Sequence, residues 1–169
     1  EGAGDSLDVQ MAMIDSALAM FSTPMPAEAA NYVLRRGQLH AAAEHYRDAV
    51  NDYNQYCFLS NNKVNTSFYY DRAKLEQKAR MYQQALDDLT TAISMAPQAA
   101  VLYIEKCALL LRVNEIDECI NIANKLLSID PQNVNALRIL GYAQTQNGEV
   151  AQGKANLQKA ADMGDESAK

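Results

Sequence analysis

The feature that most constrains the fold of this chain is a recurrence of similar residues every 34 positions. Pro97 and Pro131 are 34 residues apart, and each ends an amphipathic stretch. Proline stops one helix and can start the next, because it lacks an N–H and has a fixed φ. A period of this length indicates a stack of helix pairs, each packed only on its neighbours.

Three segments carry the repeat in register: 66–97, 100–131 and 134–165. A looser copy covers 30–63 and has two extra residues before Thr66. Small residues recur where two helices must cross closely, and larger apolar residues recur where they fill the space between helices. The aligned columns are Tyr69, Tyr103 and Leu137; Ala73, Cys107 and Gly141; Ala85, Cys119 and Gly153; Leu89, Ala123 and Leu157; and Ala92, Leu126 and Ala160.

These columns closely resemble the tetratricopeptide repeat (TPR), and the last repeat is also similar in part to Sel1-like repeats. The resemblance implies an all-α fold, a right-handed α-solenoid of antiparallel helix pairs (a TPR-like superhelix). The chain departs from the family at Arg36, Arg72 and Lys106, which occupy positions where leucine is usual. Tyr56 occupies a position where a small residue is usual, which predicts a wider helix crossing there.

We expect a single TPR-type solenoid domain over residues 1–169. Its helix pairs fall at 30–63, 66–97, 100–131 and 134–165, and an unpaired helix at 7–21 precedes them. Asn65 is the expected N-cap of the helix that follows it. Residues 165–169 are expected to begin a closing helix. Solenoid ends need polar caps, and the sequence shows no complete cap. We therefore expect the chain to be a segment of a longer protein, or to be completed by a partner at one end. The remaining helices are expected at 27–42, 44–59, 66–79, 82–95, 99–113, 116–128, 133–147 and 150–163.

The charge balance argues against nucleic acid and anionic membrane as partners. Lys and Arg number 15 against 21 Asp and Glu, which gives a net charge of −6, whereas both kinds of partner require a basic face. No apolar run approaches the length of a membrane span. Nothing in the sequence indicates the compartment, so the localisation stays unknown.

No motif for catalysis, cofactor binding or metal binding is found in the sequence, and we expect no enzyme activity and no cofactor. His40 and His45 are five residues apart, which on one helix places them about 140° from each other. A turn is also expected between them, so they are interpreted as surface or packing residues rather than a metal pair.

In the register of the resemblance, Cys107 and Cys119 face each other where two paired helices cross. One interpretation is that they are small, buried, apolar residues. The alternative is a disulfide between them, formed in an oxidising compartment, which would leave Cys57 as a free thiol.

The resemblance implies a concave groove, lined by the first helix of each pair, that binds an extended peptide or a helix. The predicted groove is apolar or aromatic in part and basic at its flanks, which suits a protein or peptide partner with apolar anchors and acidic residues. The alternative is that the apolar stripe is ordinary core. The predicted groove residues are Leu34, Gln38, Tyr70, Lys74, Gln77, Ile104, Ala108, Leu111, Arg112, Arg138 and Tyr142.

Three functions therefore stay open at this point. The first is a protein-protein interaction module that uses the groove. The second is a structural repeat domain that assembles with itself, as a homo-oligomer, or with its parent protein. The third is a non-catalytic scaffold part of a larger enzyme or transport component.

Overall fold

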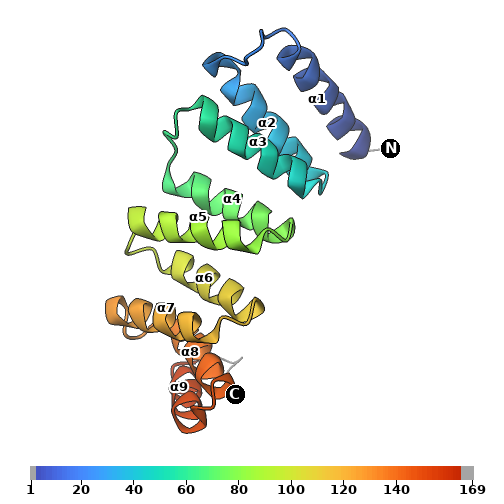
Figure 1. The fold of residues 1–169 in the computed structure, drawn as a ribbon. Helices are drawn as coiled ribbons and strands as arrows, with labels where there is room; N and C mark the ends of the chain where they lie inside the picture. Colours follow the sequence, from blue (N-terminus) through green and yellow to red (C-terminus); the bar gives the residue numbers. More distant parts are fainter. Residues whose placement is uncertain (1–2, 165–169) are drawn as a thin grey trace. The chain divides into compact units, whose positions relative to one another are not determined.

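The computed structural model describes residues 3–164, and every regular element in that range is helical (Figure 1). The predicted closing helix at 165–169 lies outside the described residues. The elements are α1 (Ala3–Leu18), the short 3-10 helix η1 (Ala27–Ala29), α2 (Ala30–Ala42), α3 (Tyr46–Leu59), α4 (Thr66–Lys78), α5 (Tyr82–Met95), α6 (Ala100–Arg112), α7 (Ile116–Ile129), α8 (Val134–Gln146) and α9 (Val150–Asp162).

The chain forms two compact units, Glu1–Ala85 and Leu86–Lys169, and each is described by itself. The first contains α1 to α4, and the second contains α6 to α9. Within the first, α2 and α3 run side by side in opposite directions, and α8 and α9 do the same within the second (Figure 1). The single domain over 1–169 stays a prediction.

Asparagine side chains cap two of the helices that open a repeat. Asn65 Oδ1 accepts a hydrogen bond of 2.9 Å from the N–H of Phe68, and Asn133 Oδ1 accepts one of 3.0 Å from the N–H of Ala136. These bonds satisfy backbone donors that the first turn of a helix leaves without a partner. The predicted cap at Asn65 is confirmed.

The turn between the two helices of a pair has a recurrent form. Glu44, Arg80 and Asn114 adopt positive φ angles of 61°, 61° and 64°, and Gly148 adopts 89° at the equivalent place. This is the left-handed residue of a Schellman motif, which ends one helix and redirects the chain. Because Glu44 belongs to that turn, α3 begins at Tyr46 rather than at the expected residue 44. The first helix also differs from expectation, since it covers Ala3–Leu18 instead of 7–21.

The core of the first unit consists of two clusters. Leu18 of α1 packs with Ala29, Val33 of α2 and Leu59 of α3. Tyr53, Cys57 and Phe68 form the second cluster between α3 and α4, with Leu34 packed against it. The first helix, which the sequence left without a partner in its own pair, therefore packs Ile14 and Leu18 against the next pair, while Val9 and Met13 stay exposed.

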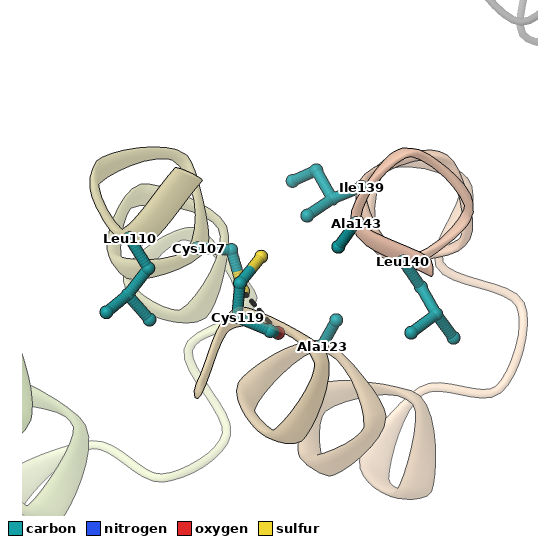
Figure 2. Packing of buried hydrophobic residues seen from close by; sticks show 7 residues of the cluster. All are labelled: Cys107, Leu110, Cys119, Ala123, Ile139, Leu140 and Ala143. Atoms are coloured by element: carbon teal, nitrogen blue, oxygen red, sulfur yellow. Dashed lines mark hydrogen bonds between the residues drawn. The ribbon is translucent and has the colours of Figure 1, made fainter. Parts of the chain in front are cut away.

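The core of the second unit surrounds the two cysteines. Side chains from α6, α7 and α8 converge on Cys107 and Cys119, with Ile139 and Ala143 opposite them (Figure 2). Both thiols are buried and free, and Cys107 Sγ lies 3.7 Å from the Cys119 carbonyl oxygen. The contact with Cys119, followed by burial, raises the pKa of Cys107 well above its usual range. The structure therefore shows small buried thiols rather than a disulfide.

Glycines make the close crossing of α8 and α9. A Cβ on Gly141 would lie 2.7 Å from Leu157 Cγ and 2.8 Å from the carbonyl oxygen of Gly153. Glycine inside a helix costs about 1 kcal/mol relative to alanine. Here the absence of both side chains lets the two backbones approach each other.

The cations that replace the usual leucines are paired with carboxylates. Arg36 donates to both oxygens of the buried Asp52, at 2.9 and 2.7 Å. Lys106 Nζ lies 3.7 Å from Glu118, and Arg72 Nε lies 3.8 Å from Glu76. Pairing offsets the cost of burying each charge.

Among the described helices, none is long and apolar enough to span a bilayer.

Candidate functional site

The first unit contains a hollow of about 580 Å³ between α2, α3 and α4, called here the aromatic hollow. Its walls come from three helices and from the loop between α3 and α4. The lining residues are Leu34 and Gln38 of α2, Tyr53 and Tyr56 of α3, Lys63, Val64 and Asn65 of the loop, and Ser67, Phe68 and Asp71 of α4.

Three aromatic rings form the floor of the aromatic hollow. Phe68 stacks on Tyr53 with ring centroids 5.6 Å apart, and Tyr56 is also 5.6 Å from Phe68 in a tilted arrangement. Rings at these distances attract each other beyond their burial alone. Tyr56 was expected to widen the crossing at this place, and the structure puts it in the wall of the hollow.

The two-residue insertion before Thr66 supplies the edge of the aromatic hollow. Asn61 and Asn62 adopt positive φ angles of 52° and 58°, which asparagine tolerates better than most residues. The Cys57 thiol donates to Asn62 Oδ1 at 3.3 Å. Lys63 and Val64, which follow, line the hollow.

The aromatic hollow is mixed in charge, since Lys63 and Asp71 are both exposed at its edge. Burial raises the pKa of Tyr53, and the negative charge of Asp71 adds to the shift. Tyr53 is therefore a neutral phenol at any ordinary pH and keeps its hydroxyl proton for donation. An apolar side chain with polar groups beside it fits such a surface.

The structure brings only two of the predicted groove residues of the first unit into this hollow, Leu34 and Gln38. Tyr70, Lys74 and Gln77 lie elsewhere on α4. The ammonium group of Lys74 sits 4.4 Å from the centre of the Tyr70 ring and 3.0 Å from Asp71 Oδ1. These contacts hold the Lys74 side chain along its own helix.

The predicted groove residues of the second unit fall into three groups. Ile104 and Leu111 are half-buried and pack against the cysteine core. Ala108, Arg112 and Tyr142 are exposed, with Tyr142 at 41%. Arg138 is half-buried and donates to Asn135 Oδ1 at 2.9 Å. The role of the exposed residues stays a prediction.

Sequence reasoning missed the residues that form the floor and edge of the aromatic hollow, namely Tyr53, Tyr56, Val64, Phe68 and Asp71. Two signals for them were present in the chain. One is the run of aromatic residues in a repeat where small residues are usual, and the other is the insertion that lengthens the loop.

The structure also differs from the expectation for the two histidines. The expected turn between them is present, and it brings the ring centroids of His40 and His45 to 6.0 Å from each other rather than separating them. With Asp48 they form a group whose ligand atoms all lie within 4.8 Å of one another.

The fold of the chain matches that of known repeat proteins. YrrB, described as a TPR protein with an unusual peptide-binding site, superposes with a TM-score of 0.75 over 97% of this chain and 81% of YrrB, at 18% identity. MamA superposes with a TM-score of 0.72 over 94% of this chain and 89% of MamA, at 19% identity. The chain has the tetratricopeptide-repeat fold. The fold class expected from the 34-residue period is thereby confirmed.

Similarity at the level of sequence covers less of the chain than similarity of fold. No family model matches the chain. Bacteriophage adsorption protein A of Escherichia coli (strain K12) is 30% identical over 76 residues, which is 45% of this chain and 8% of that protein. The matched segment thus covers less than a tenth of the length of that relative. The Sel1-like character of the last repeat stays a prediction.

Proposed function

We propose that the chain is a non-catalytic protein-interaction module that binds a segment of a partner protein, with the aromatic hollow as an anchor point. The observation that carries this proposal is the hollow itself, about 580 Å³ in volume and lined by aromatic and polar side chains. Concave, mostly apolar surfaces with a few polar groups are the usual form of a binding site.

The TPR fold supports the same function. YrrB, of similar fold, is described as having a peptide-binding site. Fold alone does not determine function, so the proposal depends on the aromatic hollow as well as on the fold.

The chemistry of the aromatic hollow suggests the partner. An aromatic or large aliphatic side chain would pack on Tyr56 and Phe68, as anchor residues of interfaces do. A backbone carbonyl of the partner can accept a hydrogen bond from the Tyr53 hydroxyl, and an acidic residue of the partner can approach Lys63 at the edge of the hollow. This agrees with the partner expected from the sequence, a protein or peptide with apolar anchors and acidic residues.

The test compares two variants with the same substitution at two exposed positions. Ser67→Arg places a long cation at the wall of the hollow. Asn51→Arg makes the same change on α3, at a position that is not among the residues lining the hollow. Ile104 is unsuited to such a test, because it packs against the core.

A library of displayed random peptides is selected on the wild-type chain, and the affinity of an enriched peptide is measured by calorimetry. We expect Ser67→Arg to weaken binding by about tenfold or more, because its long side chain fills the space that the partner's anchor residue needs, and Asn51→Arg to leave binding unchanged. Failure to enrich any peptide, or equal affinity for Ser67→Arg and wild type, would contradict the proposal.

A further inference from the structure

The turn between α2 and α3 gathers three metal-ligating side chains. His40 near the end of α2, His45 just before α3, and Asp48 in the first turn of α3 each offer one ligand atom, and these atoms lie within 4.8 Å of one another. We propose that these three residues bind a divalent transition ion of the Zn²⁺ class. This inference is independent of the aromatic hollow and of the proposed function.

Backbone geometry explains why the three side chains meet. The N–H of His45 donates to the carbonyl oxygen of His40 at 2.8 Å, across the left-handed Glu44. This is the long hydrogen bond of a Schellman motif, in which the side chains of the two bonded residues commonly touch. His45 is also the N-cap of α3 and Asp48 its third residue, and side chains at those two positions face each other.

Three other turns of the same form in the described chain contain no histidine. The equivalent long hydrogen bonds run from Met81 to Glu76, from Glu115 to Leu110 and from Glu149 to Gln144. In these three turns of the described chain the paired positions hold no imidazole. The histidines of the first turn are therefore not required by the turn itself.

The orientation of His40 matches that of a ligating histidine. Its Nε2 lies 3.8 Å from Asp52 Oδ2, and Arg36 holds that buried carboxylate with two hydrogen bonds. Its Nδ1 is buried and has no hydrogen-bond partner within the described residues. A metal-bound imidazole commonly directs its other nitrogen at a carboxylate, which orients the ring. Assigning the unpartnered Nδ1 to the ion leaves Nε2 directed at Asp52, which it must approach by a few tenths of an ångström to donate a hydrogen bond.

The donor set and its surroundings select the class of ion. Two imidazoles and one carboxylate suit Zn²⁺, Cu²⁺ or Ni²⁺, whereas Mg²⁺ and Ca²⁺ require mainly oxygen ligands. Arg47, Lys78 and Arg80 line the adjoining depression of about 400 Å³, so general negative charge does not hold the ion there. Binding must come from coordination bonds to the imidazoles.

Modest side-chain movement completes the geometry. Tetrahedral Zn²⁺ with bonds of about 2.1 Å keeps its ligand atoms about 3.4 Å apart, so atoms up to 4.8 Å apart must close by about 1.4 Å at most. His45 and Asp48 are exposed and can rotate. Three protein ligands leave a fourth position for water or for a donor atom of a partner. The bound ion would also join the end of α2 to the start of α3.

The test titrates ZnCl₂ into the tag-free chain by calorimetry. We expect one ion per chain, and a rise in Tm with zinc concentration, because a ligand that binds only the folded state stabilises it. His45→Ala and Asp48→Asn should each weaken binding by about tenfold or more. Loss of a residue that only orients a ligand already costs about 10- to 100-fold in metal affinity, and these two residues are ligands themselves. Asp117→Asn, which removes an exposed carboxylate from the first turn of α7, should bind zinc like wild type.

A spectroscopic readout separates this site from the three thiols. The chain has only two histidines, so long-range ¹H–¹⁵N spectra contain two imidazole systems, and both should change with the same one-to-one titration curve. Co²⁺ added in place of Zn²⁺ should give no thiolate-to-cobalt absorption. Absence of binding, wild-type affinity in His45→Ala, or a thiolate band would each overturn the proposal.

Discussion

At the scale of single residues, the environment of a side chain decides whether the expected effect of its type applies. Gly153 lies inside a helix, where glycine lowers stability relative to alanine. In this structure Gly153 and Gly141 face each other at the crossing of α8 and α9. Their contribution to packing outweighs their poor helix propensity.

Gly141→Ala is accordingly predicted to destabilise the second unit. The added methyl group would lie 2.8 Å from a backbone oxygen and 2.7 Å from Leu157 Cγ, so α8 and α9 would have to separate. Overpacking of this kind costs about 1–3 kcal/mol, and the gain in helix propensity of about 1 kcal/mol offsets only part of it. Urea unfolding of the variant should show a net loss of up to about 2 kcal/mol.

The comparison is Gly37→Ala in α2, where the three atoms nearest an added Cβ are all side-chain atoms of Asp52 and Tyr53, at 3.0 Å or more, and none is a backbone oxygen. It should cost less than Gly141→Ala. An unchanged or raised Tm for Gly141→Ala would show that the crossing does not depend on glycine.

The surroundings of single residues were the feature that the sequence predicted least well. The groove register placed Ile104 and Leu111 on the predicted binding surface, yet both pack against the cysteine core. The turn expected between His40 and His45 argued against a pair, yet that turn brings their rings to 6.0 Å from each other. In both cases the decisive quantity was a contact between two elements, and periodicity along one helix does not contain it.

At the scale of elements, helix positions followed closely from apolar period and turn residues. Most helices begin and end within about two residues of expectation, which is the usual uncertainty of helix boundaries. The exceptions are α1, which is shifted toward the N-terminus, and α2, which begins at Ala30 instead of 27 because residues 27–29 form the 3-10 helix η1. Because α1 lies outside the repeat, the chain contains no equivalent helix with which to align it and so define its ends.

The caps differ between repeats in a way that allows a direct experiment. Asn65 and Asn133 cap α4 and α8 with a side-chain hydrogen bond, but Ala99, at the equivalent position before α6, cannot. Ala99 already has an extended backbone, with φ −83° and ψ 92°, which suits a capping residue. Ala99→Asn is therefore predicted to stabilise the chain by about 0.5–1 kcal/mol.

The reverse change, Asn65→Ala, should destabilise by about 1 kcal/mol. Both variants can be measured by denaturant unfolding followed by circular dichroism. If Ala99→Asn lowered stability, the half-buried surroundings of residue 99 would be unable to accept the longer side chain.

At the scale of the whole molecule, the 34-residue period was enough to predict the TPR fold. It was not enough to predict the aromatic hollow, because the hollow arises where one repeat departs from the period. Tyr56 and the inserted loop are exceptions to the pattern, and a pattern predicts only what its copies share.

The stability of the whole chain is predicted to fall as pH rises above about 10. Burial raises the pKa of Tyr53 in the folded chain, so above the ordinary tyrosine pKa the unfolded chain releases a proton that the folded chain still holds. Protons then favour folding, and raising the pH removes that stability at a rate of at most about 1.4 kcal/mol per pH unit. Self-repulsion of a chain already at −6 acts in the same direction.

Thermal unfolding between neutral and alkaline pH checks this prediction, with Tyr53→Phe as the comparison. The variant should lose less stability than wild type above pH 10, because it lacks the titrating hydroxyl. Parallel curves for the two proteins would mean that Tyr53 does not contribute.

The two residues inserted before Thr66 have a consequence for how such a chain acquires new surfaces over evolution. Lengthening a loop adds little entropic cost, since that cost grows only with the logarithm of loop length. Here the added length brings Lys63 and Val64 to the edge of the aromatic hollow, while the Asn65 cap still starts α4. A repeat array can thus diversify one junction at a time, because the cap restores the register before the next helix begins.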